Sequence, residues 1–125
     1  MQDSAMQTST KWNDAVTYLD KFSPADDQMI SPSAVAALGN AYAHVKQLDK
    51  AVEYLKKAAS MADSEAADNT NNSISPIFLL QAGEILESQG KKSEALQIYQ
   101  DIKTKYLNSA VSQDIDKYIE RVSVK

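Results

Sequence analysis

The sequence predicts an all-α fold of antiparallel helix pairs stacked side by side, and three observations support this. Four landmarks recur at one fixed offset of 44 residues: Ser31-Pro32, Gly39 and Ala51 return as Ser75-Pro76, Gly83 and Ala95. A repeat of this period is typical of stacked supersecondary units. Helix-forming residues are abundant, while the chain has only three glycines and three prolines. Apolar residues recur at helical spacing, with no strand-type alternation.

Composition and charge exclude several classes of function. A length of 125 residues corresponds to one domain or a short repeat array. The formal net charge of -4, without a Lys/Arg cluster, argues against nucleic-acid binding. The absence of cysteine removes disulfides, thiol catalysis and thiolate metal sites. No apolar run reaches the ~18–20 residues that a membrane span requires, so we expect no membrane span in this chain.

Residues 12–22 are expected to form the first helix. Its apolar stripe carries four large side chains: Trp12, Val16, Leu19 and Phe22. These four residues are candidates for self-association. Two alternatives could cover the stripe: a short helix formed by residues 1–10, or a second copy of the chain. Because residues 1–10 offer only Met1, Ala5 and Met6 against four large groups, the pattern slightly favours a homodimer through this helix.

The first complete pair is expected from Ser31 onward. Ser is a good N-cap, and Pro at the first helical position loses no needed hydrogen bond. The buried stripe of its first helix contains Val35, Leu38, Tyr42 and Val45. After a turn at Lys46-Gln47, the partner helix buries Leu48, Ala51, Val52, Leu55, Ala58, Ala59 and Ala62. The small residues Gly39 and Ala51 are expected to face each other where the two helices cross.

A polar stretch, Asp63–Ser73, precedes the second pair, and its second half is expected to be a surface loop. Its acidic residues lack the glycine and the bidentate glutamate of a calcium loop, which favours an ordinary acidic loop. Ser75-Pro76 then opens a helix, Gly90 makes the turn, and Gly83 is expected to face Ala95. The stripes of this pair contain Phe78, Leu79, Ala82, Ile85 and Leu86, then Leu96, Ile98, Tyr99 and Ile102. An amphipathic helix over 109–123 is expected to cap the stack.

The strings Val35-x-x-Leu38-Gly39-x-x-Tyr42 and Ala51-x-x-x-Leu55 resemble a tetratricopeptide repeat. The second copy, Leu79-x-x-Ala82-Gly83-x-x-Leu86 with Ala95-x-x-x-Tyr99, is a weaker match in the same register. Ala15-x-x-x-Leu19 resembles the second helix of an earlier repeat. The resemblance implies a short right-handed solenoid forming a single domain over 1–125. Its expected parts are a partial repeat over 11–23, repeats over 31–63 and 75–107, and the capping helix over 109–123.

Three longer strings, AVTYLDKF, SPIFLLQAGEILESQGKKSEALQIYQDIKTKY and DIDKYIERV, resemble bacterial tetratricopeptide-like proteins related to the ancillary subunit of the SecYEG translocon. That group has one N-terminal membrane helix and a periplasmic helical-repeat domain, and is thought to assist secreted proteins. The resemblance implies a chaperone-like role and the periplasmic face of a membrane-anchored parent. This chain would then be a soluble fragment, because it lacks the membrane helix.

The family resemblance also implies a peptide groove on the inner face of the first helix of each pair. Carried onto this sequence, the groove candidates are Ala36, Asn40, Ala43, His44, Ile77, Leu80, Glu84 and Glu87. The family's carboxylate clamp uses Lys, Arg and Asn, and only Asn40 fits that pattern. Glu84 and Glu87 would repel a carboxylate, so an apolar and basic peptide is expected. The alternative is a solvated or self-associating face.

No catalytic constellation is visible in the sequence. The single histidine, His44, has no sequence neighbours that could complete a zinc site, and a nucleophile would need a base beside it. We therefore expect no enzyme, no cofactor and no metal. The expected function is a non-enzymatic protein-protein interaction module with a protein or peptide partner. The alternative is a structural self-oligomerisation domain without a peptide ligand.

Overall fold

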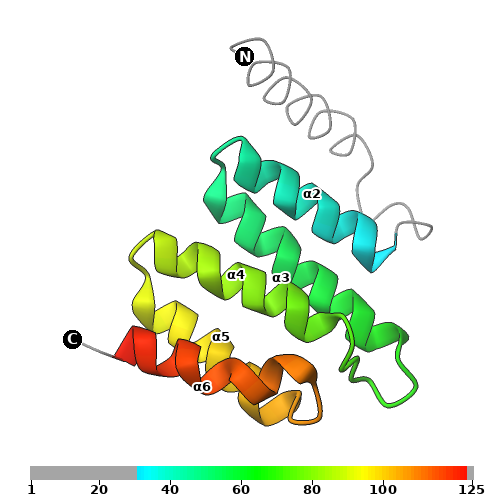
Figure 1. Ribbon diagram of the computed structural model, residues 1–125. Coiled ribbons are helices and arrows are strands. Elements are labelled where there is room, and N and C mark those ends of the chain that lie inside the picture. Colours follow the sequence, from blue (N-terminus) through cyan, green and yellow to red (C-terminus); the bar gives the residue numbers. More distant parts are fainter. Residues whose placement is uncertain (1–30, 124–125) are drawn as a thin grey trace, which may run out of the picture.

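The structure is a computed structural model that describes residues 31–123. Within this range the chain forms five helices and no strand, α2 (Pro32–His44), α3 (Leu48–Glu65), α4 (Ser75–Ser88), α5 (Lys92–Lys105) and α6 (Ala110–Ser123). Each helix packs against the next one along the chain (Figure 1). The predicted all-α fold of consecutive packed helices is confirmed. The expected partial repeat over 11–23 and its candidate stripe (Trp12, Val16, Leu19 and Phe22) lie outside the described residues.

The five helices are not equally in contact. Besides its two sequence neighbours, α4 touches α6, whereas α3 and α5 make at most marginal contact with each other. Both α3 and α5 pack on α4, which lies between them along the chain and in space (Figure 1). This arrangement leaves a surface between α3 and α5 whose base is α4.

The two Ser-Pro landmarks have different roles in the structure. Ser31 caps α2, because its Oγ accepts a hydrogen bond from the Ala34 N–H at 3.2 Å. Ser75 instead lies inside the first turn of α4, and the N-cap residue Ile74 makes no side-chain cap. The Ser75 hydroxyl is fully buried and points to α3, where it is 3.0 Å from the carbonyl oxygen of Ala59. Ser75-Pro76 therefore opens α4 as expected, but the Ser75 hydroxyl does not cap this helix.

The turns within the two pairs share one geometry. Lys46 has φ of 67° and Gly90 has φ of 78°, so the same left-handed position is filled at the same offset of 44 residues. In both turns the next N–H donates to the carbonyl five residues earlier, at 2.9 Å. This bond is one of the two that define the common helix ending in which glycine is the favoured residue. Lys46 occupies a position that glycine adopts without strain.

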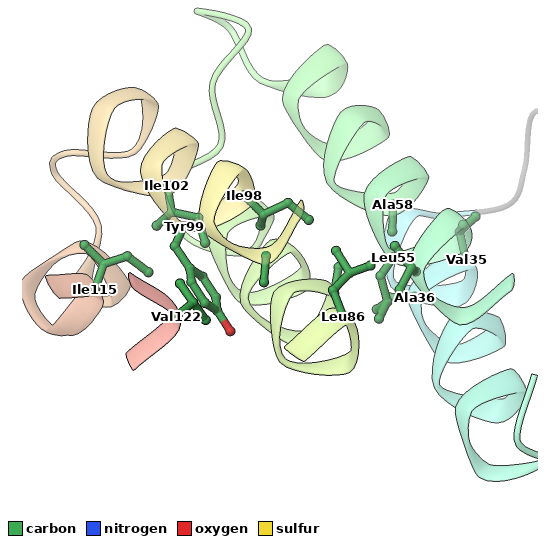
Figure 2. Close-up of a cluster of buried hydrophobic side chains, with 13 residues drawn as sticks. Val35, Ala36, Leu55, Ala58, Leu86, Ile98, Tyr99, Ile102, Ile115 and Val122 are labelled. Atoms are coloured by element: carbon green, nitrogen blue, oxygen red, sulfur yellow. The ribbon is translucent and has the colours of Figure 1, made fainter. Parts of the chain in front are cut away.

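The core runs through all five helices, and Figure 2 shows its central part. Leu55, Ile102 and Ile115 are completely buried in it. Gly39 lies close to α3, since an added Cβ would be 3.2 Å from the Ala51 carbonyl oxygen and 3.1 Å from Leu55 Cγ. The helices α2 and α3 thus approach each other closely at Gly39 and Ala51, as expected.

The second pair crosses differently. A Cβ on Gly83 would overlap the aromatic ring of Tyr99, lying 3.0 Å from its Cζ and nearer still to its Cε1. Tyr99 itself is completely buried. Gly83 therefore accommodates the Tyr99 ring, a contact that the sequence analysis did not predict, and Ala95, its expected facing partner, is completely buried. Because glycine has no Cβ, the flat aromatic ring can lie directly against the backbone of α4.

Candidate protein-interaction surfaces

The predicted groove residues differ widely in exposure. Three of them are exposed to solvent: His44, Ile77 and Glu84. Three more are half-buried: Asn40, Ala43 and Leu80. Ile77 is the most notable of these, because 44% of this large apolar side chain is exposed at the start of α4. Asn40, Ala43 and His44 lie on α2, and Ile77, Leu80 and Glu84 lie on α4.

Ala36 is buried and therefore cannot line the predicted groove. It is only 3% exposed and belongs to the same buried cluster as Val35 and Leu55. Figure 2 shows the Ala36 side chain beside Leu55, within the packing of α2. Helical periodicity put Ala36 on the inner face, but a small residue on that face lets neighbouring helices approach and is buried by them.

Glu87 is an anchor for α6 and does not act as a free groove charge. Arg121 Nε donates to Glu87 Oε2 at 2.8 Å, and Arg121 Nη2 donates to Oε1 at 2.6 Å. The Tyr99 hydroxyl donates to the same Oε1 at 2.6 Å. The guanidinium also lies 4.8 Å from the ring centroid of Tyr118. The forked pair neutralises Glu87, so its predicted part in repelling a carboxylate ligand is not supported.

The protonation of Glu87 follows from these contacts. The hydrogen bonds from Arg121 lower the pKa of Glu87, burial opposes them, and the Tyr99 hydroxyl adds to the lowering. Burial and the bond to Glu87 in turn raise the pKa of Tyr99 above its ordinary value. Glu84, one turn earlier, is left as the exposed carboxylate of the predicted acidic pair. No local signal could have indicated this pairing, because Arg121 lies 34 residues beyond Glu87.

A second polar centre surrounds Asp63, which sequence analysis placed in an acidic surface stretch. Asp63 lies in the last turn of α3 and is only 7% exposed. Its Oδ1 accepts from the Asn71 N–H and the Ser75 hydroxyl, both at 2.8 Å. Its Oδ2 accepts from Lys105 Nζ at 3.1 Å and from the Tyr106 hydroxyl. The expectation of an ordinary exposed acidic residue is therefore wrong for Asp63.

This centre ties three parts of the chain together: the end of α3, the loop before α4, and the end of α5. Burial alone raises the pKa of Asp63, but the bonds from Asn71, Tyr106, Ser75 and Lys105 together lower it below the ordinary value. Asp63 is thus held as a carboxylate in the folded protein. A buried carboxylate with this many donors stabilises the fold, and no open coordination position for a ligand is indicated.

The third feature is a channel between α3 and α5, which we name the α3–α5 groove. It consists of three adjoining hollows with volumes of about 490, 350 and 290 Å³, all lined by Lys56. Its floor is formed by Val52, Leu79, Leu86 and Ile98. Charged side chains on its rim are Glu53, Lys56, Glu94 and Asp101. Sequence reasoning missed this groove because it considered only the first helix of each pair.

Neither a metal cluster nor a membrane helix is found within residues 31–123. No group of three or more His, Asp or Glu side chains there could hold a metal ion. Likewise, none of the helices in the described range is long and apolar enough to cross a membrane.

Comparison with known proteins identifies one repeat. The tetratricopeptide repeat family model matches residues 32–65, which cover α2 and α3. No curated protein and no solved structure matches the chain. The resemblance to the translocon-associated proteins therefore has no support from these comparisons. The detected repeat agrees with the first of the two expected pairs, and the packed helices α4 and α5 follow it in the stack.

Proposed function

We propose that this chain is a non-enzymatic protein-interaction scaffold that binds a peptide segment on the face formed by α2 and α4. The detected tetratricopeptide repeat at 32–65 supports a scaffold, since such repeats mediate protein partner binding. The observation that carries the choice of face is the exposure of Ile77, a large apolar residue 44% open to solvent. Glu84 lies two turns further along α4 and is also exposed.

The chemistry of this face favours an apolar ligand with basic residues. Ile77 and Leu80 offer apolar contact, and Glu84 offers an exposed negative charge. A ligand carboxylate would be repelled by Glu84 and would not meet the guanidinium of Arg121, which is engaged by Glu87. The proposal therefore concerns internal peptide segments and not free C-termini.

Isothermal titration against unfolded secretory peptides tests this function. Glu84→Lys should weaken the binding of basic, apolar peptides, and the effect should shrink with added salt because exposed charges are screened over about 10 Å at 0.1 M. Glu120→Lys is the matched control, since Glu120 is an exposed glutamate on α6. Unchanged affinity in Glu84→Lys would remove Glu84 from the site. Self-association without any saturable peptide binding would favour the structural self-oligomerisation domain.

The narrower role, assistance to secreted or membrane proteins near the translocon, rests on the sequence resemblance alone. A photo-crosslinking residue placed at Ile77 would test it in cells. Crosslinks to secretory chains or translocon subunits would support the role. Crosslinks confined to unrelated partners would require its withdrawal.

The homodimer through Trp12 is a separate proposal, supported by the apolar stripe in the sequence. Trp12→Glu should then convert a dimer to a monomer in sedimentation while the helix content stays constant. A wild-type chain that sediments as a monomer at high micromolar concentration would contradict the dimer.

A further inference from the structure

The α3–α5 groove is closed at each end by an ion pair, one between α3 and the residue that precedes α5, the other between α3 and the last residue of α5. At one end Lys91 Nζ lies 3.1 Å from Asp49 Oδ1, and at the other Lys105 Nζ lies 3.1 Å from Asp63 Oδ2. The two pairs are 14 residues apart along both helices. At a rise of about 1.5 Å per residue, the stretch between them is about 21 Å long. This length matches about six residues of extended peptide.

The charges between the two end pairs are predominantly negative. Glu53, Glu94 and Asp101 line the stretch, and Lys56 is the only positive side chain there. None of these four residues forms an ion pair within the described part of the chain. The Asp101 carboxylate accepts a hydrogen bond from the neutral Gln97 amide at 3.0 Å, and its partner there is not a cation. The groove therefore presents an excess of uncompensated carboxylates.

The floor of the groove is apolar. Val52, Leu86 and Ile98 are between 5% and 9% exposed, and Leu79 is half-buried. These side chains come from three helices, because α3 and α5 are separated and α4 supplies the base. Apolar side chains inserted between the rims would contact this floor, while neighbouring cationic side chains would reach the carboxylates. The groove has an apolar floor and negatively charged sides. It is therefore complementary to a peptide that contains both apolar and basic residues.

We propose that the α3–α5 groove binds a short apolar and basic segment of a partner protein. This surface is separate from the α2–α4 face, so one chain can hold two segments at once. Charge complementarity distinguishes the partner from a second copy of this chain, which itself has a net charge of -4. A copy with the same excess of negative charge is repelled by the groove at long range.

The test is a titration of the full chain with a short capped peptide in which leucines are interspersed with lysines. The groove variant Glu53→Gln/Glu94→Gln/Asp101→Asn should bind it at least about threefold more weakly, since each exposed pair is worth a factor of roughly 1.5 to 5. The matched control is Glu65→Gln/Asp114→Asn/Glu120→Gln, which removes the same charge from exposed carboxylates that lie outside both surfaces. In the wild type, amide NMR shifts should concentrate around Val52 and Ile98.

Each result is decisive. Weakening in the groove variant alone, with shifts around Val52 and Ile98, supports the proposal. Unchanged binding by the groove variant, with shifts confined to α2 and α4, overturns it and supports peptide binding at the α2–α4 face alone. Equal weakening in both variants means attraction by overall charge and overturns it too. Peptide-independent self-association that the groove variant abolishes assigns the groove to a second copy, again against the proposal.

Discussion

The ring of Tyr99 lies over Gly83, where a Cβ would overlap it. A methyl group there would force the buried ring or the backbone of α4 to move. We predict that Gly83→Ala lowers the free energy of unfolding by about 1–3 kcal/mol, the usual cost of overpacking a tight contact. This loss exceeds the gain of up to about 1 kcal/mol in helix propensity. Urea unfolding followed by circular dichroism measures the difference.

Gly39→Ala is the control for this prediction. Its added Cβ would meet Leu55 Cγ at 3.1 Å, a contact that a shift of a few tenths of an ångström relieves. Gly39→Ala should therefore cost less than Gly83→Ala. A Gly83→Ala variant at least as stable as the wild type would mean that Tyr99 does not occupy this position.

The Asp63 centre leads to a second prediction. Tyr106→Phe removes one donor to a buried carboxylate and should lower the free energy of unfolding by about 1.5–3 kcal/mol. Tyr118→Phe is the matched control, since the Tyr118 hydroxyl makes no hydrogen bond within the described residues, and it should change stability by less than about 0.5 kcal/mol. Chemical denaturation of the wild type and both variants gives the values. Equal stability of the Tyr106→Phe and Tyr118→Phe variants would contradict a structural role for Asp63.

The same carboxylates predict how stability depends on pH. Asp63 and Glu87 have pKa values lowered from 3.8 and 4.5 in the folded protein. A lowered pKa contributes stability above the unfolded value, and this stability is lost as pH falls through the folded value. Unfolding free energy should therefore decrease as pH falls below about 4.5. The pH dependence of the urea midpoint should be shallower in Asp63→Asn/Glu87→Gln, whereas Glu84→Gln/Glu120→Gln should follow the wild type.

Lys46 provides a stabilising prediction. It holds φ of 67°, where the equivalent residue of the second pair is Gly90. A left-handed backbone conformation costs a non-glycine residue roughly 1–2 kcal/mol. Substitution by glycine removes this strain, but the greater conformational freedom of glycine in the unfolded chain offsets part of the gain. Lys46→Gly should therefore raise the free energy of unfolding by about 0.5–1 kcal/mol, and Gly90→Ala should lower it. Thermal unfolding shows the direction, and a lower Tm for Lys46→Gly would contradict this.

The helices and their pairing could be predicted from the sequence because their signals are local. Apolar spacing within one helix places Leu55 and Ile115 in the core. The offset of 44 residues identifies Gly39 and Gly83 as equivalent positions of the two helix pairs. The turns at Lys46 and Gly90 were expected at the correct residues for the same reason. Helical periodicity is a property of neighbouring residues and does not require knowledge of distant ones.

The candidate sites could be predicted only in part, because their chemistry depends on distant residues. Periodicity placed Ile77 and Glu84 on an exposed face, and both are exposed. It also placed Glu87 there, but a guanidinium from a helix 34 residues later neutralises that carboxylate. Asp63 was expected in an acidic surface stretch, but it is buried and accepts a hydrogen bond from Tyr106, which is 43 residues away.

The sequence by itself determined the all-α class, the positions of the turns and the repeat that α2 and α3 form. Only the tertiary structure decided which charges are paired and which remain free. Glu84, Glu87 and Asp63 are similar in sequence context, yet one is exposed and two are held by donors from other helices. Helix formation depends on residues three or four positions apart, whereas the charge available to a partner depends on which side chains folding brings together.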